Sequence, residues 1–109
     1  MTEWHLVGDA DMVSPDKPVA VTVGSASVVL FRTGDVVTAL RDRCPHRFAP
    51  LSMGKIVDGG LQCAYHGLRF GTDGKCVHNP HGDGTIPELA KVALYGVKQR
   101  DGKIYVKLD

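Results

Sequence analysis

The chain has 109 residues, 43% of them hydrophobic, which suits one small domain with a modest core. Its 13 basic and 12 acidic residues give a net charge of +1, so charge provides no argument for a nucleic-acid or membrane-surface partner. No apolar run approaches the roughly 20 residues of a spanning helix, and the opening residues lack a signal-peptide core, so no membrane association is predicted.

The first part of the chain is predicted to form short strands separated by turns. Apolar and β-branched runs alternate with clusters of Gly, Asp, Ser and Pro, the pattern typical of antiparallel strands. The predicted strands are Trp4 to Val7, Val19 to Val23, Ser27 to Arg32 and Val36 to Leu40. Because the last three follow one another so closely, we expect an antiparallel meander, and no stretch here has a helical period.

An insertion into this β structure is predicted at about residues 42–80. Two hairpin turns are expected within it, at residues 58–60 and 71–74. The flanking strands are predicted at Ile56-Val57, Leu61-Gln62, Leu68 to Phe70 and Lys75 to Val77. After it, Asn79 to Pro87 is too rich in Gly and Pro for a strand, and Glu88 to Ala90 are expected to form one helical turn.

Two last strands return the chain to the main sheet. They are predicted at Val92 to Lys98 and Lys103 to Leu108, joined through a turn at residues 100–102. The fold class predicted for residues 1–109 is therefore all-β: a single domain built as an antiparallel sandwich or partly open barrel, with a smaller β subdomain at about 42–80.

The insertion contains two Cys/His pairs with metal-ligand spacing. Cys44-Pro-His46 is followed by sixteen residues and then by Cys63-Ala-Tyr-His66. Side chains two or three residues apart on a turn can converge on one point, so each pair can approach a metal from one side. Two thiolates and two imidazoles suit either a structural Zn²⁺ or an iron–sulfur cluster of the Rieske kind.

The arrangement of the pairs favours the cluster over zinc. A Cys₂His₂ zinc finger places its two Cys on a hairpin and its two His on a helix. Here each half combines one Cys with one His, neither half lies on a helical pattern, and proline or glycine residues flank both halves. Two such loops can close over a two-iron unit, with Cys44 and Cys63 on one iron and His46 and His66 on the other.

At these residues the sequence resembles the Rieske [2Fe-2S] domain of aromatic-ring oxygenases, particularly the vanillate O-demethylase-like enzymes. The resemblance is carried by CPHRFAPLSMGKI and LQCAYHGLRFGTDGKCVHNP and extends over most of the chain. It implies a [2Fe-2S] cluster that receives electrons from a reductase of the flavin or ferredoxin type. It also implies that the acceptor is the mononuclear iron site of a terminal oxygenase, for which this chain is expected to hold no site of its own.

Residues around the ligands predict a low reduction potential. Rieske proteins of respiratory complexes carry a disulfide between the cluster loops, where this chain has Ala49 and Tyr65. They also carry hydroxyl donors two and four residues after the second His ligand, where this chain has Leu68 and Phe70. Fewer donors to sulfur make the reduced, more negative cluster harder to form. We expect a potential near the low end of the Rieske range, about −150 mV.

Other reactive or aromatic side chains are interpreted as structural. Cys76 is expected to be a small buried residue on a strand, and His5 a strand-edge residue. His78 and His81 are interpreted as ordinary loop histidines, and Trp4 as a core residue or a contact with a larger protein. Arg47 is left open between a role near the cluster and a surface charge.

Two functions are therefore expected, and both transfer single electrons. The first is the amino-terminal Rieske module of an aromatic-ring oxygenase or demethylase. The alternative is a free-standing Rieske ferredoxin that shuttles electrons from a reductase to a terminal oxygenase. The three cysteines are too few for a disulfide scaffold, so the expected location is the cytoplasm.

Overall fold

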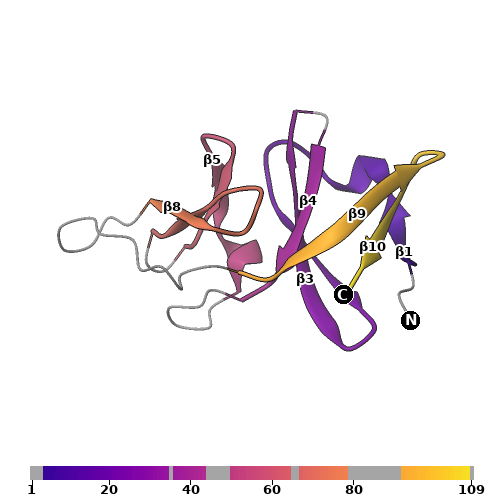
Figure 1. Cartoon of the computed structure of the whole chain (residues 1–109). Coiled ribbons are helices and arrows are strands. Elements are labelled where there is room, and N and C mark those ends of the chain that lie inside the picture. Colours follow the sequence, from indigo (N-terminus) through magenta and orange to yellow (C-terminus); the bar gives the residue numbers. More distant parts are fainter. Residues whose placement is uncertain (1–3, 35, 44–49, 65–66, 79–91, 109) are drawn as a thin grey trace.

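The computed structural model describes residues 4–34, 36–43, 50–64, 67–78 and 92–108. Its described residues form two antiparallel sheets, which lie side by side in Figure 1. No helix in these ranges is long and apolar enough to cross a membrane. Two single turns of 3-10 helix, η1 (Ala10–Met12) and η2 (Leu51–Met53), accompany the strands.

The larger sheet has six strands and curls into a nearly closed barrel. Its order is β1 (Trp4–Asp9), β10 (Lys103–Lys107), β9 (Leu94–Arg100), β4 (Val36–Arg41), β3 (Ala26–Thr33) and β2 (Val19–Val23). The two edge strands, β1 and β2, contact each other. The predicted meander of β2, β3 and β4 is confirmed, as is the return of the last two strands to the main sheet.

The smaller sheet lies within the predicted insertion. It consists of β5 (Lys55–Val57), β6 (Gly60–Gln62), β7 (Arg69–Phe70) and β8 (Cys76–His78), in that order. The β5–β6 turn is the two-residue Asp58-Gly59, with φ of 48° and 78°, and Asp101-Gly102 closes the β9–β10 hairpin in the same way. Asp-Gly tolerates such left-handed pairs, which match the twist of the strands. The hairpins predicted in the insertion, at residues 58–60 and 71–74, are both confirmed.

Strand β3 is buried on both faces and joins two cores. Val28 and Leu30 pack inside the barrel, together with Ile104 of β10. The alternate residues Val29 and Phe31 pack in a second core that also includes the small sheet. All four β3 residues are 0% exposed. The run is therefore continuously apolar rather than alternating, as a strand buried on both faces requires.

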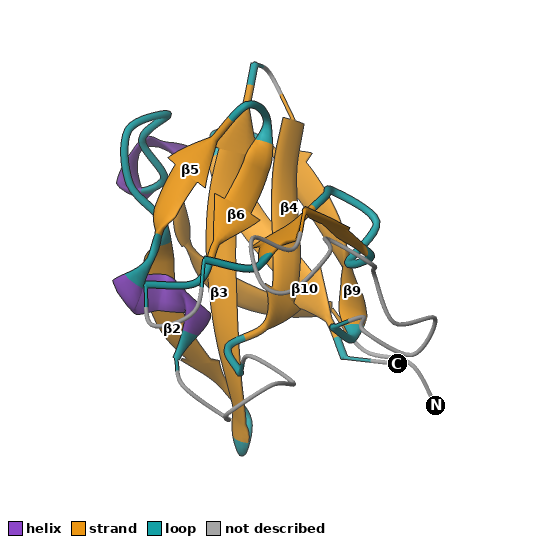
Figure 2. Cartoon of the chain, turned by 90° about the vertical axis from the view of Figure 1, so that its left-hand side faces the viewer, coloured by secondary structure: helices purple, strands orange, loops and turns teal. Residues whose placement is uncertain are grey.

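The second core holds the small sheet against the large one. Directly paired residues of adjacent strands lie on one face of a sheet, and one such row of the small sheet is buried. This row contains the buried Leu61, Phe70 and Cys76 and the partly buried Ile56. Figure 2 shows β5 and β6 in front of β3 and β4, which agrees with this packing. Gly74 lies in the turn between β7 and β8, and its carbonyl accepts a hydrogen bond from Val92 N–H at 2.7 Å. This bond ties the turn to the segment that leads into β9.

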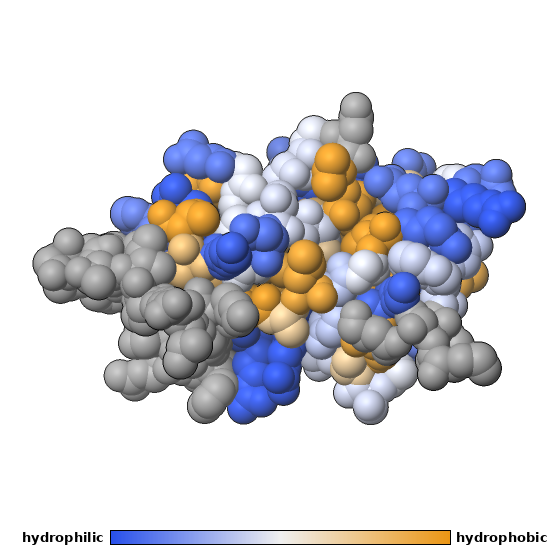
Figure 3. All heavy atoms as spheres, in the orientation of Figure 1, coloured by the Kyte–Doolittle hydropathy of each residue, from blue (hydrophilic) through white to orange (hydrophobic). Residues whose placement is uncertain are grey.

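Several predicted details differ from the structure. Trp4 is not a core residue: it lies on the edge strand β1, 39% exposed, with the ammonium of Lys98 4.6 Å from its ring centroid. Figure 3 shows separate apolar patches on this side of the molecule, surrounded by hydrophilic surface. His5 is an edge-strand residue, as predicted. Strand β9 begins two residues later than predicted, because the backbone N–H of Val92 is hydrogen-bonded to the Gly74 carbonyl instead of to a neighbouring strand of the large sheet. The predicted loop at 79–87 and helical turn at Glu88 to Ala90 lie outside the described residues.

The two faces of β3 give a matched pair of core substitutions. Val28→Ala and Val29→Ala each remove two buried methyl groups, so each should lower the free energy of unfolding by about 2 kcal/mol. Only Val29→Ala loosens the contact between the sheets. Hydrogen exchange should therefore accelerate at Leu61 and Phe70 in Val29→Ala before it does at Val106, and in the reverse order in Val28→Ala. Identical exchange patterns in the two variants would contradict the two-core arrangement.

Candidate metal centre

Cys63 is the described residue of the four predicted ligands, and it stands where β6 turns toward β7. Its side chain is a free thiol and 1% exposed. Its N–H donates to the Leu68 carbonyl at 2.8 Å, and its carbonyl accepts from Gly67 N–H at 3.0 Å. Gly67 has a φ of 73°, which a glycine adopts without strain. These bonds close a tight loop between Cys63 and Leu68, within which the predicted ligand His66 is located in sequence.

The segment that contains the first ligand pair is closed at its base by a carboxylate. Both oxygens of Asp42 accept hydrogen bonds from Ser52, one from the backbone N–H and one from the hydroxyl, each at 2.7 Å. Cys44 and His46 lie between these two residues in sequence and, like His66, are outside the described residues. A carboxylate that accepts two hydrogen bonds from a single residue fixes the separation of the two ends of this loop.

A hollow of about 310 Å³ lies between η2 and the turn at Cys63. It is lined by Met53, Gly54, Lys55, Gln62, Cys63, Ala64 and Gly67. Gly54 allows the two walls to approach: a Cβ on it would lie 1.9 Å from the backbone oxygen of Gln62. No other residue fits there without moving the end of β6, and with it Cys63.

The hollow suits a metal bound through sulfur. A free thiol in its lining supplies the soft donor that iron–sulfur clusters and zinc prefer. Cys63 belongs to the same core as Leu68 and Phe70, which are 5% and 0% exposed. Neither of those side chains carries a hydrogen-bond donor. The thiol therefore lies at the border between an apolar core and an open hollow.

Other residues singled out in the sequence lie apart from this hollow. Cys76 is 7% exposed on β8, as predicted, and its thiol donates to the His78 carbonyl at 3.4 Å. His78 was predicted in a loop but is the last residue of β8, where its side chain is exposed. The strand continues to it because it pairs with Arg69. His81 and Arg47 are outside the described residues.

The sequence did not identify the residues that position the loops. Asp42 and Ser52 are ten residues apart, and neither shows the spacing of a turn or a cap. A usable signal was their placement on either side of the first ligand pair. Gly54 was noticeable because it lies between Met53 and a predicted strand with no turn pattern around it. The close approach that requires a glycine there involves Gln62, which is eight residues away.

The fold and the hollow together describe a β domain with a buried cysteine thiol beside an open site. A family model of the Rieske [2Fe-2S] domain matches residues 3–98. The chain belongs to this family, whose general function is electron transfer through a Rieske-type [2Fe-2S] cluster.

The relatives of this chain include oxygenase components. It is 46% identical over 104 residues to the oxygenase component of dicamba O-demethylase from Stenotrophomonas maltophilia, covering 94% of this chain and 30% of that protein. It is 36% identical over 104 residues to the vanillate O-demethylase oxygenase subunit of a Pseudomonas species, covering 94% and 28%. The resemblance to vanillate O-demethylase-like proteins is confirmed.

Solved structures of related proteins contain the same fold. A crystal structure of dicamba monooxygenase with non-heme iron and dicamba superposes with a TM-score of 0.93 at 44% identity, covering 98% of this chain and 33% of that one. The predicted fold class is confirmed. The chain spans only part of these relatives, from 28% to 33% of their length.

The carboxylate at the base of the first loop gives a prediction. Ser52→Ala removes one of the two hydrogen bonds to Asp42, so the free energy of unfolding should fall by about 1.5–2 kcal/mol. This is the lower part of the range for a charged acceptor, because the pair is only partly buried. An iron chelator should also remove the cluster faster. Ser25→Ala, on the exposed β2–β3 turn, is the control. Equal cluster-loss rates in the two variants would contradict a positioning role for Ser52.

Proposed function

We propose that residues 1–109 form a single Rieske domain that transfers single electrons as a module of an oxygenase or demethylase system. The observation that supports this most strongly is the match of 98% of the chain to one part of a dicamba monooxygenase, with a TM-score of 0.93. The buried free thiol of Cys63 beside the 310 Å³ hollow supports it independently.

The proposed ligands are Cys44 and Cys63 for one iron and His46 and His66 for the other. When bound, such a cluster accepts and releases one electron at a time, at a higher potential than an all-Cys cluster. The chain's own residues hold the ligand loops: Ser52 and Asp42 fix the base of the first, and the hydrogen bonds at Cys63 fix the second. Loops held in place before the metal arrives lose less conformational entropy when it binds.

We further propose a potential near the low end of the Rieske range, about −150 mV. The burial of Leu68 and Phe70 in the core that contains Cys63 supports this, since their side chains offer the sulfurs no donor. A low potential suits a reductase of the flavin or ferredoxin type as donor and the mononuclear iron site of the oxygenase as acceptor. The free thiols of Cys63 and Cys76 support a reducing compartment, which we propose is the cytoplasm.

The ligand assignment is tested by spectroscopy on the dithionite-reduced protein. We expect two irons per chain and an EPR spectrum with the low average g value of a Rieske cluster. Cys44→Ser and Cys63→Ser should each abolish both. Cys76→Ser should keep them, since Cys76 is the buried cysteine outside the ligand pairs. One zinc per chain with no signal would overturn the electron-transfer function.

The potential is tested by returning a hydroxyl to the core around Cys63. Phe70→Tyr should raise the midpoint potential, because a donor near a sulfur stabilises the more negative reduced cluster. Phe31→Tyr places the same hydroxyl in the same core but on β3, outside the ligand turn, and should leave the potential unchanged. Protein-film voltammetry on samples matched for iron content measures both. An unchanged potential in Phe70→Tyr would count against the proposed cause of the low potential.

A further inference from the structure

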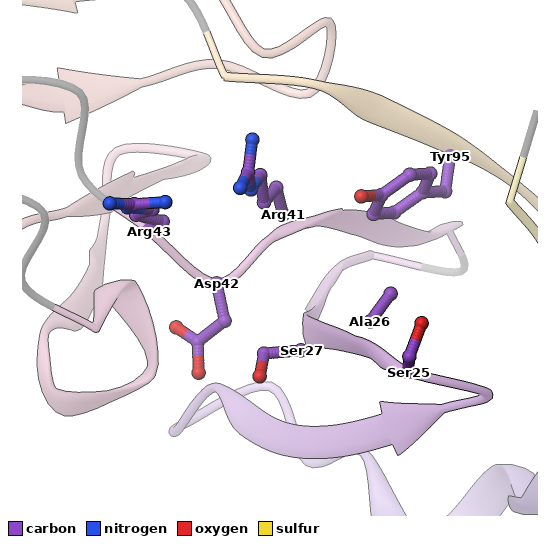
Figure 4. Close-up of a pocket in the computed structure, with 7 residues that line it drawn as sticks. All are labelled: Ser25, Ala26, Ser27, Arg41, Asp42, Arg43 and Tyr95. Atoms are coloured by element: carbon purple, nitrogen blue, oxygen red, sulfur yellow. The ribbon is translucent and has the colours of Figure 1, made fainter.

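A second hollow, of about 430 Å³, lies where β4 ends and the chain leaves the large sheet for the insertion. Its lining is mainly polar and comes from three parts of the chain. These are the β2–β3 turn with the start of β3, the end of β4 with the segment after it, and β9. The residues are Ser25, Ala26, Ser27, Arg41, Asp42, Arg43 and Tyr95 (Figure 4).

Two arginines present their charge on one side of this hollow. Arg41 and Arg43 are two residues apart, and in Figure 4 both guanidinium groups lie on the same side of the backbone. The Tyr95 hydroxyl points toward Arg41 in the same view. Both arginines are exposed. The hollow therefore combines two cations with a hydroxyl that can donate a hydrogen bond.

Asp42, the acidic residue among the described lining residues, forms no ion pair with Arg41. The Asp42 side chain points to the opposite side of the backbone from the two guanidinium groups (Figure 4), and its oxygens accept the two hydrogen bonds from Ser52. The Asp42 backbone N–H is bonded to the Ser27 carbonyl at 3.0 Å, which fixes this orientation. Within the described ranges, Arg41 makes no ion pair.

We propose that this hollow docks acidic side chains of the electron-donor protein. The inference rests on the proposed function, because it names the surface that the donor uses. Charge complementarity selects the occupant: guanidinium groups pair with carboxylates in a fixed bidentate geometry. Arg43 directly precedes the proposed ligand Cys44 in the chain, so a donor bound here sits beside the first ligand loop.

The exposure of the arginines favours a protein over a small anion. An exposed charge pair in water gains little, so a lone phosphate would bind weakly in so open a site. A protein partner instead brings several carboxylates at once, excludes water from the contact and is steered by charge during its approach. Exposed cations of this kind mainly raise the association rate and make it depend on salt.

The experiment measures electron transfer from a reduced, acidic plant-type ferredoxin to the cluster-loaded chain by stopped-flow absorbance. One electron leaves the ferredoxin, which is oxidised, and reduces the cluster of this chain. The variants are Arg41→Gln, Arg43→Gln and the double variant. Arg100→Gln is the matched control, since it makes the same charge change on an exposed residue at the other end of β9 from Tyr95.

At low ionic strength we expect each of the two substitutions to lower the second-order rate constant about three- to tenfold. The double variant should lose most of the salt dependence, and Arg100→Gln should behave as the wild type does. Rates that fall equally in Arg100→Gln overturn the proposal. Unchanged ferredoxin rates, with loss of phosphate binding in a calorimetric titration, make the hollow a small-anion site and also overturn it.

Failure of this inference can be told apart from failure of the proposed function. Dithionite is a small reductant that does not need the docking surface, so all variants should still give the Rieske EPR signal with it. If that signal is present and the arginine substitutions have no effect, only the docking site is wrong. If the wild type gives no such signal, the proposed function fails.

Discussion

The burial of β3 on both faces is the constraint on which the rest of the structure depends. One face closes the barrel, and the other supports the small sheet that leads into Cys63. The position of this thiol relative to the large sheet is therefore set by side-chain packing, mainly of Val29 and Phe31 against Leu61 and Phe70. A close-packed interior does not deform gradually, so the ligand turn has a rigid base.

Hydrogen bonds add to side-chain packing in positioning the candidate site. The apolar core holds β6 together with Cys63 and Leu68. Hydrogen bonds join the ends of the two segments that contain the proposed ligands: Asp42 with Ser52 for one, and the Cys63 backbone with Leu68 and Gly67 for the other. Asp42 also separates Arg41 from Arg43 in the chain. By turning its carboxylate toward Ser52, it leaves the two cations on the opposite side.

Much of the fold was predictable because its signals are local. Apolar runs, Asp-Gly turns and the Cys/His spacing each lie within a few residues; the first two predicted the strands and hairpins that the structure confirms, and the third predicts the ligand set. The core placement of Trp4 was wrong because aromatic character alone does not tell which face of an edge strand it occupies. Its side chain lies over Gly96 on the outer surface, and that neighbour is ninety-two residues away. The Asp42–Ser52 contact and the approach of Gly54 to Gln62 likewise depend on register between segments, which the sequence does not display.

The pairing of β1 with β10 also determines when the molecule can fold. Trp4 pairs with Lys107, so the first strand has no neighbour on one side until the last strand has left the ribosome. The small sheet pairs only sequential strands, and such local contacts form quickly, whereas contacts across almost the whole chain form slowly. We expect the region around Cys63 to take shape early and the barrel to close last. Iron delivery during synthesis would then meet a ligand turn whose rigid support is still incomplete.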